Sequence, residues 1–132
     1  MELLQAIKER RTIRRFKPDP IPRELLEQLI QGAMWAPSAM NEQPWKFYVL
    51  TGAAKADLAN IAEGCIEKLD LRMQKLFNEK MRTMVRGYFK DFGGAPAVVV
   101  VVTKMPEERV YQRGSEYGSS AAMQNFLLLA HE

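Results

Sequence analysis

The chain has 132 residues, of which 47% are hydrophobic and 27% are charged, which is the composition of an ordinary globular protein. This length is sufficient for one hydrophobic core, so we expect a single domain over residues 1–132. The sequence contains no apolar run long enough to span a bilayer and no secretion signal, so we expect no membrane partner and a cytoplasmic location. Cys65 is the only cysteine in the sequence, which excludes an internal disulfide and a cysteine-based metal site within one chain.

The net charge of +3 is unevenly spread and is concentrated near the N-terminus. Seven lysines and arginines lie between Lys8 and Arg23, against two acidic residues in the same interval. Such a concentration of positive charge attracts an anion. Nucleic acid is the general candidate, but this interval has no aromatic residue except Phe16, and the chain has no recognisable nucleic-acid-binding module. A small phosphate is therefore the better prediction.

The first elements place this charge on an extended arm. Residues 2–10 have the apolar spacing of a short amphipathic helix. Prolines at positions 18, 20 and 22 cannot continue a helix, so residues 10–16 are expected to be extended. The arm carries forked donors and a hydroxyl that suit the terminal oxygens of a phosphate, namely Arg10, Arg11, Arg14 and Thr12. For each arginine taken alone, the alternative is a solvated helix end with surface salt bridges.

A loop with two prolines follows the second helix. The helix is expected over residues 23–35, and Pro37 ends it because the residue before a proline avoids the helical conformation. Residues 46–51 are aromatic and β-branched and predict a buried strand. Between them, Ser38 and Asn41 offer groups that can orient a ligand, but no group that titrates near neutral pH. This composition indicates a binding loop, and the alternative is that both side chains only satisfy backbone groups of a turn.

The rest of the chain alternates helices with one strand. Residues 53–69 predict a helix, and residues 70–92 predict an amphipathic helix rich in methionine and aromatic residues, a face that is usually core. The β-branched run at residues 97–103 predicts a central strand covered on both faces. A polar connection over residues 105–113 leads to a helix over residues 115–132, which is apolar on more than one face and is expected to be buried. His131 is interpreted as a helix-end residue and not as a catalyst.

The arm and the loop together resemble a known family. The arm Arg10-Arg11-Thr12-Ile13-Arg14-Arg15-Phe16 and the loop Ala36-Pro37-Ser38-Ala39-Met40-Asn41-Glu42-Gln43-Pro44-Trp45, in this order and spacing, resemble the N-terminal half of the FMN-dependent nitroreductase family. The resemblance implies an α+β fold with a mixed central sheet flanked by helices, and an intertwined homodimer. Chains of this family normally continue through a further strand, a helix and a late basic pair, so we expect this chain to be incomplete at its C-terminus.

The resemblance also implies roles for individual residues. Arg10, Thr12 and Arg14 would grip the phosphate and ribityl chain of FMN, and Arg11 would contribute through its backbone or side chain. Four loop residues would pack on or hydrogen-bond the isoalloxazine ring of the flavin bound to the partner subunit: Pro37, Ser38, Ala39 and Asn41. Residues 70–92 would roof the flavin and offer Met73, Phe77, Tyr88 and Phe89 to a substrate. Gly118, Ser119 and Ser120 would lie at the N-terminal end of the last helix, where backbone donors could approach the flavin.

The implied activity is a hydride transfer from NADH or NADPH through FMN to a nitroaromatic, a quinone or a related small-molecule acceptor. The flavin would carry the chemistry, so the resemblance implies no catalytic side chain and no metal. One alternative is an FMN-binding or flavin-handling protein without NAD(P)H turnover. A third hypothesis is a basic-arm module that binds nucleic acid or an acidic partner, although no nucleic-acid partner is expected.

Overall fold

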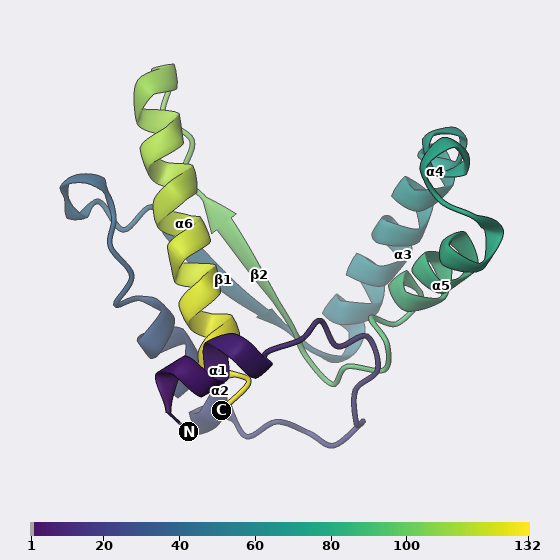
Figure 1. Cartoon of the computed structure of the whole chain (residues 1–132), viewed down its shortest axis with the longest axis horizontal. Helices are drawn as coiled ribbons and strands as arrows, with labels where there is room; N and C mark the ends of the chain where they lie inside the picture. Colours follow the sequence, from purple (N-terminus) through teal and green to yellow (C-terminus); the bar gives the residue numbers. More distant parts are fainter. Residues whose placement is uncertain (1) are drawn as a thin grey trace. The chain divides into compact units, whose positions relative to one another are not determined.

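The computed structural model describes residues 2–132 and has the α+β composition that the sequence predicts (Figure 1). Its elements are α1 (Leu3–Glu9), α2 (Arg23–Ala33), the short 3₁₀ helix η1 (Ala39–Asn41), β1 (Trp45–Leu50), α3 (Gly52–Lys68), α4 (Asp70–Leu76), α5 (Glu79–Phe89), β2 (Val98–Thr103) and α6 (Arg109–Leu129). The predictions for α1, α2, α3 and both strands are confirmed to within two residues at each boundary.

The chain forms two compact units, each made of segments that are distant in sequence. The first unit comprises Met1–Arg11, Ile21–Tyr48 and Val99–Glu132, and the second unit comprises Thr12–Pro20 and Val49–Val98. A single domain over residues 1–132 stays a prediction.

Helix α6 organises the first unit. Its buried residues are small, namely Ser115, Gly118, Ser119 and Ala122. Ala122 packs with Ala36 and Trp45 in a small core, and the rings of Phe47 and Phe126 stack with centroids 6.5 Å apart beside it. Helix α2 also packs on α6, where Gly32 lies directly against the Leu129 side chain. Close packing at glycine and alanine therefore lets α2 and the Trp45 side chain approach α6 in this core.

Strands β1 and β2 pair with each other, and the N–H of Lys104 donates to the carbonyl of Pro44 at 2.8 Å. This bond joins the end of β2 to the start of β1, so the pair is antiparallel (Figure 1). The prediction that both strands are buried is wrong for the described chain: in β1 only Trp45 is buried, and β2 is half-buried, with Val102 exposed. Among residues 2–132 the sheet has two strands, so each strand has one edge without a strand partner.

The second unit is built from α3, α4 and α5. Ala59, Phe92 and Ala95 form its buried core. The rings of Tyr88, Phe89 and Phe92 meet edge to face beside it, with centroids 5.2 to 6.2 Å apart.

The prediction of one helix over residues 70–92 is wrong, because the chain leaves the helix at Phe77 and starts again after Asn78. The side-chain oxygen of Asn78 accepts a hydrogen bond from the backbone N–H of Met81 at 2.9 Å. This contact is an N-cap, and it satisfies a donor that the first turn of α5 would leave unpaired.

Helix α6 begins earlier than the sequence predicts. It starts at Arg109 and not near Ser115, so the predicted polar connection over residues 105–113 is wrong in its second half. Gly118, Ser119 and Ser120 consequently lie inside the helix and not at its N-terminal end. Their backbone N–H groups belong to the interior of a helix, where such donors are used by the preceding turn, so their predicted approach to a ligand as helix-end donors is wrong. The prediction that this helix is buried on more than one face is also wrong. Helix α6 is buried on the face that carries its small residues, whereas Met123, Leu127 and Leu129 are exposed.

Candidate functional site

The basic arm begins at the end of α1. Residues 10–22 have no regular secondary structure, as the prolines predict. The Arg11 guanidinium donates from Nη1 to the carbonyls of Lys8 at 2.6 Å and Arg10 at 2.9 Å. These carbonyls lie at the C-terminal end of α1, where they lack partners within the helix and where a positive charge is favourable. Arg11 is thus engaged in ending α1, and its contribution to a ligand stays a prediction.

The arm then crosses into the second unit, which contains Thr12 and Arg14. The N–H of Phe16 donates to the carbonyl of Gly93 at 2.9 Å, and the carbonyl of Arg14 lies against Gly93. Thr12 and Arg14 are both exposed. A cavity of about 650 Å³ opens between this part of the arm and α5. It is lined by Arg14, Arg15, Phe16, Thr83, Met84, Gly87, Tyr88, Asp91, Gly93 and Gly94. The structure therefore brings two of the predicted site residues, Arg14 and Tyr88, to one cavity.

The loop after α2 is tightly folded. The Ser38 hydroxyl oxygen accepts a hydrogen bond from the backbone N–H of Gln43 at 3.0 Å, and the Gln43 carboxamide donates to Asn41 Oδ1 at 3.2 Å. Met40, Asn41 and Gln43 have φ values of +52°, +56° and +48°, in the left-handed region that non-glycine residues seldom adopt. Ser38 thus satisfies a backbone group of the turn, as in the alternative interpretation, whereas the Asn41 side chain accepts from the side chain of Gln43. Each keeps further donors, the Ser38 hydroxyl proton and the Asn41 amide, that a ligand could use.

The loop is seated on α6 at two glycines one helical turn apart. A Cβ at Gly118 would lie 3.2 Å from Ser38 Cβ and 3.5 Å from the Pro37 carbonyl oxygen, and a Cβ at Gly114 would lie 3.2 Å from Ala39 Cβ. Glycine at these two positions therefore allows the loop to pack closely on α6. The sequence analysis did not single out Gly114 and gave Gly118 a different role, and the signal that could have identified the pair is their Gly-x-x-x-Gly spacing within a helix.

The eight predicted cofactor residues are divided between the units. Arg10, Arg11, Pro37, Ser38, Ala39 and Asn41 belong to the first unit, and Thr12 and Arg14 belong to the second. A site that contains all eight stays a prediction.

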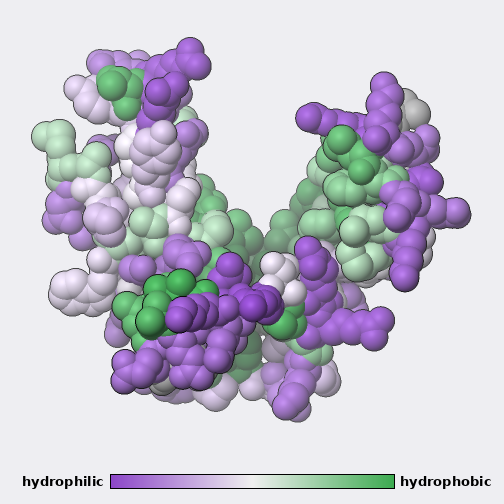
Figure 2. All heavy atoms as spheres, viewed as in Figure 1, coloured by the Kyte–Doolittle hydropathy of each residue, from purple (hydrophilic) through white to green (hydrophobic). Residues whose placement is uncertain are grey.

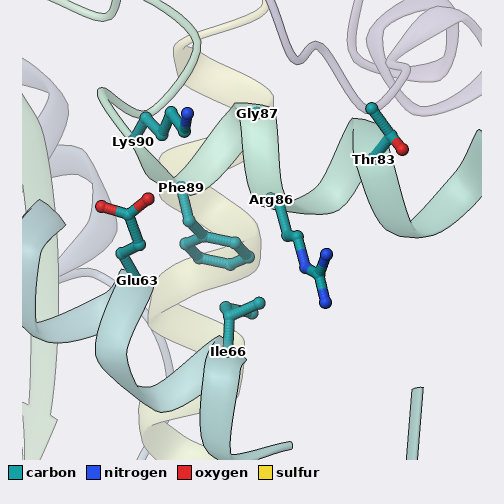
Figure 3. A pocket seen from close by; sticks show the side chains of 7 residues that line it. All are labelled: Glu63, Ile66, Thr83, Arg86, Gly87, Phe89 and Lys90. Atoms are coloured by element: carbon teal, nitrogen blue, oxygen red, sulfur yellow. The ribbon is translucent and has the colours of Figure 1, made fainter. Parts of the chain in front are cut away.

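The four candidate substrate residues lie in different environments. Phe89 lines a pocket of about 480 Å³ between α3 and α5, with Glu63, Ile66, Thr83, Arg86, Gly87 and Lys90 (Figure 3). Figure 3 shows the Phe89 ring and Ile66 facing each other from the two helices, with the charged side chains around them. Tyr88 lines the arm cavity instead, Met73 is buried, and Phe77 is exposed in the link between α4 and α5. Their role toward a substrate stays a prediction.

His131 lies in the turn that follows α6. Its Nε2 atom is buried, and it has no hydrogen-bond partner within residues 2–132. The described residues contain no group of three or more His, Cys, Asp or Glu side chains that could hold a metal ion. None of the helices described is both long enough and apolar enough to cross a membrane.

Comparison with known proteins confirms the resemblance. The sequence pattern of the nitroreductase family matches residues 7–132. Over 98% of its length the chain is 30% identical to YfhC of Bacillus subtilis (strain 168), a protein whose name assigns it provisionally as an NAD(P)H nitroreductase. The chain spans 64% of that relative.

Solved structures agree with the sequence relatives. A nitroreductase-like family protein from Bacillus cereus superposes with a TM-score of 0.75 at 27% identity, covering 98% of this chain and 64% of that one. A Desulfovibrio desulfuricans protein, provisionally named a nitroreductase and solved in complex with FMN, superposes with a TM-score of 0.64 at 26% identity, covering 98% and 62%. The predicted nitroreductase-like α+β fold is confirmed, and the chain belongs to the nitroreductase family.

Proposed function

We propose that this chain binds FMN and works as an oxidoreductase that passes hydride from NADH or NADPH to a nitroaromatic, a quinone or a related acceptor. Members of the nitroreductase family are oxidoreductases, and a structural neighbour is solved with FMN. The observation that carries the proposal is the docked arm, which presents the exposed Arg14 beside Arg15 on a cavity of about 650 Å³. A fixed backbone carrying guanidinium groups next to open space suits a phosphate monoester.

The residues present fit the two ends of FMN. Arg10, Thr12 and Arg14 would hold the phosphate and the ribityl chain, because they offer guanidinium and hydroxyl donors on an extended segment. Ser38 and Asn41 would donate to the flavin ring from a loop whose shape is fixed by its own hydrogen bonds. Pro37 and Ala39 would pack against the ring.

The chemistry would belong to the cofactor. Bound FMN supplies hydride transfer between a nicotinamide and an acceptor, and the protein supplies binding, orientation and electrostatics. The loop contributes amide and hydroxyl dipoles that do not titrate near neutral pH, so it would set the polarity around the ring without exchanging protons. Arg14 would neutralise phosphate charge and thereby keep the cofactor bound.

We also propose that the chain is a cytoplasmic homodimer in which the loop of one subunit meets the flavin held by the other. Trp35 immediately precedes the loop and Met40 lies within it, and both side chains face solvent, 87% and 93% exposed. Covering them in a partner subunit would remove apolar surface from water, which favours association.

The decisive experiment separates binding from turnover. The purified chain is titrated into FMN while the quenching of flavin fluorescence is followed, and NADH or NADPH oxidation is then measured with a quinone and with a nitroaromatic acceptor. Saturable binding with acceptor-dependent oxidation would support the proposal. Binding without oxidation would instead favour a flavin-handling protein, and no binding would contradict both.

Arg14→Ala tests the assigned phosphate contact. Hydrogen bonds to a charged group are worth about 1.5 to 3 kcal/mol, so FMN affinity should fall by about tenfold to a hundredfold. Arg23→Ala is the matched control. Arg23 is 87% exposed and pairs with Glu27 at 2.7 Å, a hydrogen bond and charge contact that raises the pKa of the guanidinium above its ordinary value. FMN affinity should be the same in Arg23→Ala as in the wild type, and an unchanged affinity in Arg14→Ala would contradict the assignment.

A further inference from the structure

The turn between α5 and β2 is hydrogen-bonded to the arm at Gly93. Its carbonyl accepts the hydrogen bond from the N–H of Phe16 at 2.9 Å, and its own N–H donates to the carbonyl of Tyr88 at 3.2 Å. Gly93 thus joins the end of α5 to the arm through its two backbone polar groups. Its φ of +67° lies in the left-handed region, where glycine has no steric penalty.

Conformation alone does not account for glycine at this position. A Cβ built on Gly93 would overlap the carbonyl oxygen of Arg14 and would lie 2.8 Å from its carbonyl carbon. Both atoms are backbone, so they cannot rotate away as the end of a long side chain could. Any residue other than glycine at position 93 must therefore displace the arm at Arg14.

We propose that Gly93 is the positioning residue of the arm: it lets the Arg14 backbone approach the turn and so directs the Arg14 guanidinium to the phosphate of FMN. Two successive contacts fix this segment, the Arg14 carbonyl against Gly93 and the Phe16 N–H on the Gly93 carbonyl. A backbone fixed on both sides of residue 15 restricts the directions in which Arg14 can point. The proposal rests on the FMN-binding function proposed above, because it assigns a role in that same site.

The chain contains a matched control for this role. Gly52 has a φ of +51°, and a Cβ there would meet nothing within 4 Å. Both glycines have left-handed backbone, whereas only the Cβ at position 93 would overlap the arm. Asparagine tolerates this backbone region, so Gly→Asn at each position adds a Cβ with little conformational penalty.

The test compares FMN with riboflavin, which has the same ring and no phosphate. Gly93→Asn should lose at least about tenfold of the preference for FMN over riboflavin, as Arg14→Ala should, whereas Gly52→Asn should keep the wild-type ratio. Riboflavin affinity should stay the same in all variants, which a general loss of folding would not allow. A wild-type preference in Gly93→Asn would overturn the proposal.

Amide hydrogen exchange at Phe16 provides a readout without any ligand. Exchange should become faster in Gly93→Asn and stay at the wild-type rate in Gly52→Asn, because only the first displaces the acceptor of that N–H. Unchanged exchange would overturn the positioning role even if the wild-type chain bound no FMN, so the two proposals fail separately.

Should Gly93→Asn not fold, Phe16→Pro removes the same hydrogen bond from the arm side and should reduce the FMN preference, with Phe16→Ala as the control that keeps the N–H. An unchanged FMN preference in Phe16→Pro would again overturn the proposal.

Discussion

At the scale of single residues, Asn78 starts α5 through one hydrogen bond to the Met81 N–H. Asn78→Ala should lower the free energy of unfolding by about 1 kcal/mol, because the first turn then loses the side-chain oxygen that caps it. Chemical denaturation measures the change, and Lys80→Ala, on the exposed surface of the same helix, should change the stability by less than about 0.5 kcal/mol. Equal stability of Asn78→Ala and the wild type would show that the cap contributes nothing.

Two buried hydroxyls should have the opposite effect. Within residues 2–132, the Oγ atoms of Ser115 and Ser119 are buried without a hydrogen-bond partner. Ser115→Ala removes an unsatisfied polar atom, so the free energy of unfolding should rise by about 1 kcal/mol. Ser120→Ala is the control, because its hydroxyl is exposed and donates to the Glu116 carbonyl at 2.7 Å. A loss of stability in Ser115→Ala would mean that the hydroxyl is satisfied in solution, for instance by a buried water.

Some of these residue roles could be predicted from the sequence, and others could not. Asn78 precedes Glu79 in a pattern that signals a helix start, so attention to capping as well as periodicity would have divided residues 70–92 correctly. Gly93, in contrast, has its role because Arg14 lies against it, and the two are far apart in sequence. Two successive glycines predict a turn, but they do not indicate which distant segment of the chain packs against that turn.

At the scale of elements, the helical glycines divide into two classes. A Cβ at Gly64 in α3 or at Gly87 in α5 would meet nothing within 4 Å, whereas a Cβ at Gly118 in α6 would press on Ser38 and Pro37. Gly64→Ala and Gly87→Ala should each raise the free energy of unfolding by up to about 1 kcal/mol through helix propensity. Gly118→Ala should gain the same stabilisation from helix propensity. The close contact of its Cβ with Ser38 and Pro37 should offset that gain, so the free energy of unfolding should stay equal or fall. Thermal unfolding of the three variants measures the order, and a Gly118→Ala variant as stabilised as the other two would contradict the close seating of the loop.

Element boundaries could be predicted where proline or glycine marks them. Pro22 precedes α2, Pro44 precedes β1 and Gly52 begins α3, and these boundaries agree with the structure. At the start of α6 the marker misleads, because Gly114 lies inside the helix, and Arg109 and Arg113 are on its exposed side. Polar composition alone does not distinguish a connection from a solvated helix face, which has the same composition.

At the scale of the whole molecule, the burial of strands and helices could not be predicted from apolar composition. The unbroken valine run of β2 suggested cover on both faces, yet the strand is only half-buried in the described chain. An apolar strand favours burial of its two faces. Its sequence does not indicate whether the residues that bury them belong to the same chain. The proposed arm and loop residues are divided between the two units, a division that periodicity does not encode.

Helix α1 leads to the last prediction, because its apolar face is turned to solvent. Leu3, Leu4 and Ile7 are 65%, 62% and 53% exposed, and Figure 2 shows apolar side chains at the surface where α1 lies in Figure 1. An amphipathic helix whose apolar stripe lacks a cover in its own chain is typical of an interface between subunits. If α1 lies in the proposed homodimer interface, the double variant Leu4→Glu with Ile7→Glu should raise the dimer dissociation constant by at least about a hundredfold, because two charges would be desolvated in each subunit. Sedimentation equilibrium measures that constant, with Ile61→Glu as the control at an equally exposed site in α3, 64% exposed, where no change is expected. An unchanged constant in the double variant would place the interface elsewhere, and a monomeric wild type at all concentrations would contradict the homodimer itself.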